Sequence, residues 1–137
     1  MLHVALALTL AAGCRQPAGP VCFPVSGQVL KNGRPLAEAL VAFHPVAQAE
    51  DVFPKPSAVT DAEGRFRLMT FTADDGAPAG RYAITVELRA TRQVGEELVR
   101  DGPNTLPKRY ASPQTSQLEY EVVAGENAVP PLVIEPR

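Results

Sequence analysis

His44 is the first side chain to consider for catalysis, because a serine hydrolase needs a histidine base beside its nucleophile. The 137-residue chain has one other histidine, His3, in an N-terminal segment that we expect to be removed. None of the four serines stands in a G-x-S-x-G turn, the context that exposes a nucleophile at a sharp bend. His44 follows Phe43 and precedes Pro45 at the expected end of a strand. We therefore expect a structural histidine and no catalytic residue.

Two acidic pairs are the next candidates. Asp61 and Glu63 lie in a turn, and Asp74 and Asp75 precede a glycine. Carboxylates in loops can bind Ca²⁺, but neither pair matches the calcium-loop motif, and Asp before Gly is common in ordinary turns. A glycosidase needs two carboxyl groups at a defined distance in space. The sequence does not give the distances between these side chains, so this alternative stays open. We expect no bound metal and no cofactor, and we keep these four residues as candidate loop contacts.

Aromatic platforms for a glycan are scarce in this chain, which contains no Trp. Tyr82 and Tyr120 fall on the expected inward faces of two strands. Tyr110 lies outside the expected strands, so it is the remaining candidate for an exposed ring that contacts a ligand.

Cys14 follows a segment that is typical of exported proteins. Residues 4–12 read V-A-L-A-L-T-L-A-A, which is too short for a membrane span of about 20 residues and suits the apolar region of a secretion signal. Three small residues lead directly to Cys14. This resembles the lipobox of bacterial lipoproteins, in which the cysteine is acylated and becomes the first mature residue. Ala11 replaces the usual leucine and no Lys or Arg precedes the apolar run, so a plain signal peptide or a start upstream of Met1 are the alternatives.

The segment after the signal predicts a tether. Residues 14–23 read C-R-Q-P-A-G-P-V-C-F, which is typical of a short Pro-rich spacer. If Cys14 carries lipid, Cys22 has no cysteine partner, and we expect it to be a small buried hydrophobe before the first strand. If Cys14 is not acylated, the two cysteines can form a small disulfide loop. With His44 they are too few for a structural metal site.

Composition excludes two classes of protein. Thirteen basic and 15 acidic side chains give a net charge of −2, which offers no basic field for a nucleic-acid backbone. Fourteen prolines and 10 glycines are too many for a bundle of long helices and suit short strands joined by turns.

Alternation of apolar and polar residues predicts seven strands. They cover residues 25–29, 39–43, 58–60, 66–68, 82–88, 118–122 and 132–134. The segments 46–57, 73–80 and 90–107 read as loops, the last with at most one helical turn near residues 96–99. We predict an all-β fold, a single antiparallel β-sandwich of about seven strands. The expected organisation is a lipoprotein signal peptide over residues 1–13, the tether over 14–23 and the sandwich over 24–137.

The same alternation assigns side chains to the two faces of the strands. We expect a buried set consisting of Phe43, Phe66, Tyr82, Ile84 and Tyr120. Arg65 and Thr85 are expected to point outward to solvent.

Several turn motifs occur in an order that is typical of one family. V-S-G-Q-V (25–29), N-G-R-P-L (32–36) and A-L-V-A-F-H-P (39–45) are followed by T-D-A-E-G-R-F (60–66) and P-A-G-R-Y (78–82). This order resembles the carboxypeptidase-regulatory-like, transthyretin-like domain over roughly residues 24–135. With the lipobox-like start and the tail over residues 106–118, the chain resembles small surface lipoproteins of planctomycete-type bacteria. The resemblance implies a prealbumin-like (Ig-like) topology and no reaction, because fold alone implies none.

These observations together predict a non-enzymatic exported lipoprotein that displays its β-sandwich at the cell envelope in a structural, adhesive or protein-interaction role. We expect a membrane contact through the N-terminal lipid anchor, an envelope protein or glycan as partner, and no nucleic-acid partner. By resemblance to lipoprotein sorting in enteric-type bacteria, Arg15 after Cys14 favours the outer membrane. The alternative is a binding module that takes a small molecule, peptide or glycan at its loop ends, with or without Ca²⁺.

Overall fold

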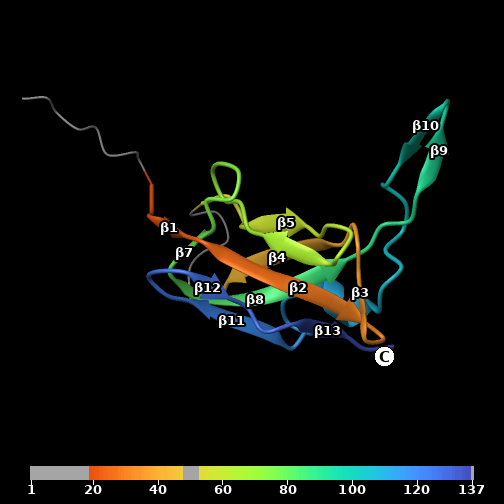
Figure 1. Ribbon diagram of the computed structural model, residues 1–137. Helices are drawn as coiled ribbons and strands as arrows, with labels where there is room; N and C mark the ends of the chain where they lie inside the picture. Colours follow the sequence, from red (N-terminus) through yellow and green to blue (C-terminus); the bar gives the residue numbers. More distant parts are fainter. Residues whose placement is uncertain (1–18, 48–52, 137) are drawn as a thin grey trace, which may run out of the picture.

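The two longest strands, β2 (Val25–Lys31) and β8 (Gly80–Glu87), each lie inside one sheet of a β-sandwich (Figure 1). The computed structural model describes residues 19–47 and 53–136. The first sheet has the order β11-β8-β4-β5 and is antiparallel throughout. Its other strands are β11 (Leu118–Val122), β4 (Leu40–Pro45) and β5 (Ser57–Val59).

The second sheet is built around β2. Two antiparallel neighbours, β6 (Arg65–Arg67) and β3 (Arg34–Pro35), pair with it. Two C-terminal strands, β12 (Asn127–Ala128) and β13 (Leu132–Ile134), pair with it in parallel. The all-β sandwich is thus confirmed, while these two pairings differ from the purely antiparallel arrangement that we predicted. After β11 the chain crosses to the other sheet and reaches β2 running in the same direction, and alternation of side chains does not encode that direction.

Each of the seven predicted segments contains a strand, and six shorter strands add to them in the described residues. Near the N-terminus, β1 (Cys22–Phe23) pairs with β7 (Ala77–Pro78). A separate hairpin consists of β9 (Arg92–Val94) and β10 (Glu97–Val99). The described helical structure is one 3₁₀ turn, η1 (Lys108–Ala111), which packs on β8.

The β9–β10 hairpin corrects the prediction of a loop with one helical turn near residues 96–99. Gly95 turns the chain with a φ of 61°, and the hairpin projects from the end of the domain opposite to β1 (Figure 1). Its base is fixed by ion pairs of Arg92 with Asp101 and of Arg100 with Glu38. Because the hairpin packs on neither sheet, its strands carry no inward apolar face that the sequence could reveal.

The core is centred on three aromatic rings. Phe43 lies edge-on to Phe66 with ring centroids 6.4 Å apart and contacts Tyr82 at 5.7 Å. These rings and Ile84 are buried, as the alternation predicted. Tyr120 is only half-buried at the margin of the core.

Tyr82 also makes a polar contact that resembles the tyrosine corner of β-sandwiches. Its hydroxyl donates to the carbonyl of Pro78 at 2.6 Å. Burial raises the pKa of Tyr82 to about 12, so the hydroxyl keeps the proton that this hydrogen bond needs at any physiological pH.

Thr85 is buried, which corrects its predicted outward exposure. Its hydroxyl contacts His44 Nε2 at 2.8 Å, and η1 packs on the same strand. Both alternating sets of β8 side chains are therefore buried, and the alternation of a half-buried strand does not apply here.

Candidate functional site

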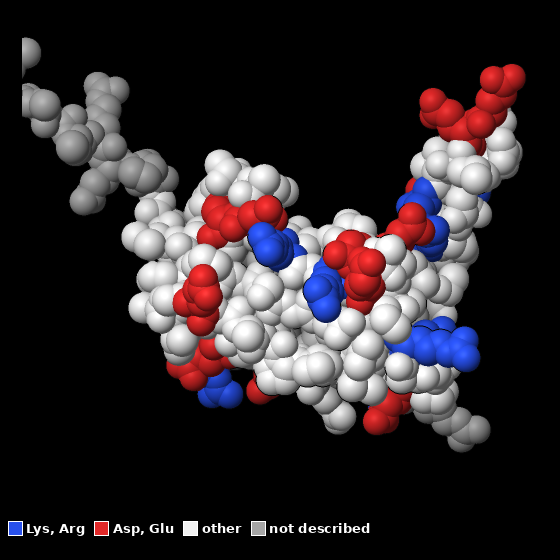
Figure 2. All heavy atoms as spheres, viewed as in Figure 1, with Lys and Arg blue, Asp and Glu red and all other residues white. Residues whose placement is uncertain are grey.

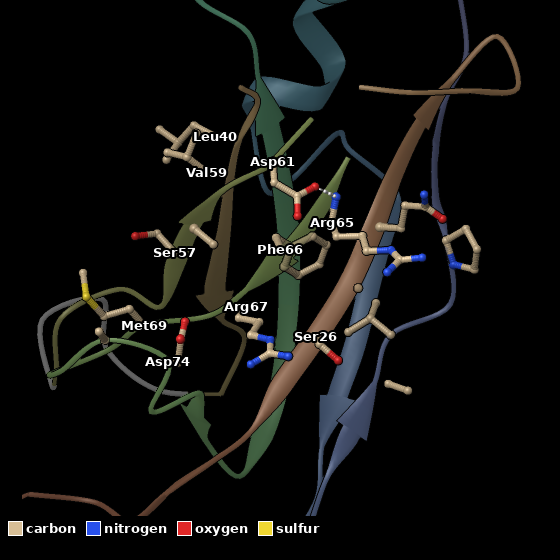
Figure 3. A pocket seen from close by; sticks show the side chains of 17 residues that line it. Ser26, Leu40, Ser57, Val59, Asp61, Arg65, Phe66, Arg67, Met69 and Asp74 are labelled. Carbon is tan, nitrogen blue, oxygen red and sulfur yellow. Dashed lines mark hydrogen bonds between the residues drawn. The ribbon is translucent and has the colours of Figure 1, made fainter. Parts of the chain in front are cut away.

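A groove opens where the two sheets meet, between the neighbouring strands β5 and β6 (Figure 3). The two strands form no ladder with each other. Residues at their ends close the gap: Ser57 and Met69 exchange two backbone hydrogen bonds of 3.0 Å, and Asp61 N–H donates to the Arg65 carbonyl at 2.9 Å. The depression here has a volume of about 920 Å³ and extends across β6 to Ser26–Gln28 of β2 and to Ala128, Val129 and Pro131.

One side of this β5–β6 groove is apolar. Leu40, Val59 and Met69 line it and are 42%, 63% and 47% exposed. Three large side chains in contact with water along one depression are more informative than scattered single ones, because such clusters mark binding surfaces.

The other side of the groove is cationic. Arg65 and Arg67 are exposed and line it, since alternate residues of β6 share one face. Neither guanidinium forms an ion pair or a hydrogen bond with another residue in the described part of the chain. Figure 2 shows basic and acidic groups beside one another in the middle of this face. The prediction that the Arg65 side chain points outward to solvent is confirmed.

Asp61 lines one end of the groove. Its Oδ1 accepts the backbone N–H groups of Glu63 and Arg65 at 3.0 and 2.9 Å, the usual arrangement of an Asp-initiated turn. Glu63 is exposed and does not line the groove. Its backbone carbonyl accepts a hydrogen bond from Gln28 Nε2 at 2.8 Å, which ties the turn to β2.

Asp74 lines the opposite end of the groove, whereas its neighbour Asp75 organises a loop. The Asp75 carboxylate accepts the backbone N–H groups of Thr70, Phe71 and Thr72 at 2.7, 2.9 and 3.0 Å. Burial raises the pKa of Asp75, but these hydrogen bonds outweigh it and hold the pKa below the usual value. The Asp75 oxygens are thus occupied by the loop backbone, and no group of three His, Cys, Asp or Glu residues within 19–47 and 53–136 is arranged to hold a metal ion.

Tyr110 is buried, which overturns its assignment as an exposed loop contact. It lies in η1 with 3% of its surface exposed. Its phenolic oxygen accepts hydrogen bonds from Arg109 Nη2 at 2.6 Å and from the Glu135 backbone N–H at 2.9 Å. The ring therefore anchors the C-terminal segment to the core. Because η1 is not a strand, alternation of apolar and polar residues could not indicate that Tyr110 is buried.

His44 lines a smaller depression of about 320 Å³ on the outer face of the first sheet, with Lys55, Thr85 and Glu87. Its Nε2 lies 2.8 Å from the Thr85 hydroxyl. This hydrogen bond joins β4 to β8.

Cys22 lies in β1 and is half-buried. Burial raises the pKa of its thiol, and the nearby Asp75 carboxylate raises it further. The thiol therefore stays protonated and weakly nucleophilic at neutral pH. Cys14 and the apolar run before it lie outside the described residues. No helix in residues 19–47 or 53–136 is long and apolar enough to cross a bilayer.

Comparison with known proteins leaves the family of this chain open. No family model and no curated protein matches it. Among solved structures, a 9R-lipoxygenase from Cyanothece PCC8801 is similar over 85% of this chain and 17% of its own length, with 18% sequence identity and a TM-score of 0.44. The chain spans a small part of that protein.

Proposed function

We propose that the chain is an exported lipoprotein that displays its β-sandwich at the cell envelope and catalyses no reaction. The observation that carries this proposal is the apolar run that ends at Gly13-Cys14. Such a run is long enough for a secretion signal and too short for a span. The order of the turn motifs over residues 25–82 supports a carboxypeptidase-regulatory-like domain, a family in which we expect binding or display and no catalysis.

The spacing between Cys14 and the fold fits this role. The first strand begins at Cys22, and eight residues span at most about 29 Å when fully extended. A lipid on Cys14 would therefore hold the sandwich close to the membrane surface. Arg15 favours the outer membrane as its site.

Replacement of Cys14 by Ala is expected to abolish acylation. The protein then moves from the membrane fraction to the soluble fraction, or accumulates as a precursor with its signal uncleaved. Mass spectrometry of the N-terminal peptide reads the modification, and fractionation reads the location. The matched control is Cys22→Ala, which removes the other thiol and should leave acylation intact. An unmodified Cys14 in the wild-type protein, or a mature N-terminus elsewhere, contradicts the proposal.

A second candidate function is ligand binding, and the β5–β6 groove favours it. Two guanidiniums without a partner among the described residues face the same groove. Their Cα atoms are two residues apart on one strand, a spacing of about 7 Å. Acidic side chains at alternate positions of an extended peptide have the same spacing, and arginine forms strong charge-assisted hydrogen bonds with carboxylates. In this proposal the ligand contacts lie on the exposed face of β6, with Asp61 and Asp74 at the borders of the groove.

The double variant Arg65→Ala/Arg67→Ala is expected to weaken binding of an extended peptide with alternating Glu residues by about tenfold or more. Titration calorimetry with the purified protein measures the affinity. The control Lys31→Ala/Arg34→Ala removes two positive charges that do not line the groove. Equal weakening in both double variants would show that net charge alone attracts the peptide, and no binding by the wild type would eliminate this candidate.

A further inference from the structure

Exposed apolar side chains gather at the end of the sandwich where the N-terminal segment enters the fold. β4 and β11 both end beside the first residues of β8, and β1 pairs with β7 directly before β8. Four large apolar residues beyond these strand ends are exposed: Val21, Val46, Phe71 and Val123. Val21 and Phe71 are 71% and 45% exposed, although an aromatic ring in contact with water is unfavourable without a partner.

Phe71 is held in this exposed position by its own loop. The Asp75 carboxylate accepts the N–H groups of Thr70, Phe71 and Thr72, so the loop backbone is fixed. The Phe71 ring lies beside Gly19, with its Cζ atom 3.5 Å from the position that a Cβ would occupy there. The ring therefore contacts the chain directly before β1.

The two segments that carry Val21 and Phe71 have no charged side chain, whereas Asp74, Asp75, Arg81 and Glu121 lie at the same end of the domain. Residues 16–30 and 68–73 contain no Lys, Arg, Asp or Glu. In Figure 2 the protruding part of the surface nearest the grey N-terminal trace is white, and acidic groups lie at its base. The β9–β10 hairpin at the other end carries acidic groups at its tip. An apolar patch bordered by charged groups suits a bilayer surface, because the patch enters the lipid while the charges stay in water.

We propose that the Phe71 loop and Val21 form a second membrane contact, which rests on the lipid surface that holds the acyl chains of Cys14. This inference rests on the proposed function. Gly19 is five residues from Cys14, a distance of at most about 18 Å, so Phe71 lies within reach of the bilayer surface. The anchor supplies a high effective concentration, so the loop needs little affinity of its own. The contact orients the domain with the β9–β10 hairpin directed away from the membrane.

Single tryptophans test this contact cleanly, because the natural chain contains none. Phe71→Trp and Val21→Trp are each introduced into the full chain, which is isolated from membranes in its processed form. The proteins are reconstituted into phosphatidylcholine vesicles with brominated acyl chains, which quench only fluorophores that reach the lipid. Each of these variants is expected to lose a large part of its emission relative to vesicles without bromine, because the indole reaches the acyl chains. The matched control is Leu98→Trp on the hairpin, which should keep its emission.

The outcomes separate this inference from the proposed function. The mass of the N-terminal peptide is measured on the same samples. An acylated Cys14 with unquenched tryptophans at both positions 21 and 71 overturns the membrane contact and leaves the lipoprotein assignment intact. Equal quenching of the Leu98→Trp control also overturns it, because the domain would then have no fixed orientation. An unacylated Cys14 contradicts both.

Discussion

Replacement of Phe66 by Ala is expected to lower the free energy of unfolding by about 3–5 kcal/mol. The ring is 3% exposed and packs edge-on against Phe43. It also covers Gly27 on the neighbouring strand, since an added Cβ there would lie 2.6 Å from Phe66 Cζ. Neither Gly27 nor an alanine at position 66 can fill the space that the ring leaves, so a cavity remains. Such a loss is a large part of the stability of an ordinary domain.

Urea denaturation followed by circular dichroism measures this effect. The matched control is Arg65→Ala on the outward face of the same strand, which should change the stability by less than about 0.5 kcal/mol. The hydrogen bond of residue 65 to Asp61 uses the backbone N–H, so the substitution preserves it. Similar losses in the two variants would mean that the faces of β6 are assigned wrongly.

Replacement of Gly76 by Ala is the second change with a large expected effect. Gly76 has a φ of +88°, and an added Cβ would overlap the Phe23 carbonyl oxygen. The substitution therefore combines backbone strain with a collision against main-chain atoms that cannot rotate away. We expect a loss of at least about 3 kcal/mol, because the variant must displace β1 from β7.

Gly95→Ala separates the two contributions. Gly95 also has a positive φ, +61°, but no atom lies within 4 Å of its added Cβ. This control should lose only the left-handed penalty of about 1 kcal/mol. Thermal denaturation of both variants provides the comparison. A Gly76→Ala protein as stable as Gly95→Ala would contradict the close approach of the two chain segments.

Much of the sandwich could be predicted because its strands have one buried face. Phe66 and Tyr82 were assigned to the core from alternation alone, and both are buried. The hairpin at residues 92–99 escaped prediction because both of its faces are in solvent. The burial of Thr85 escaped prediction because it depends on segments far apart in the sequence, His44 of β4 and the η1 turn that packs on β8.

The candidate site was only partly predictable, for a related reason. Asp61 and Asp74 were selected as loop carboxylates, and both border the β5–β6 groove. The outward assignment of Arg65 is correct, but that Arg65 lines the same groove as Leu40 and Val59 depends on how the two sheets meet. The alternation of apolar and polar residues within one strand does not indicate where two neighbouring strands separate. Asp75 is also a loop carboxylate, but it does not line the groove. Its oxygens accept backbone N–H groups of its own loop.

The parallel pairing of β2 with β13 determines how the domain responds to tension. Force applied between the N-terminal segment and residue 136 pulls β2 and β13 in opposite directions along their common axis. Their three paired positions, Val29 with Leu132, Leu30 with Val133 and Lys31 with Ile134, are then sheared together. In a hairpin such as β9–β10, the same force at the open end would break the hydrogen bonds one after another. A domain tethered at one end and engaged by a partner at the other would therefore resist extension until the whole strand pair gives way.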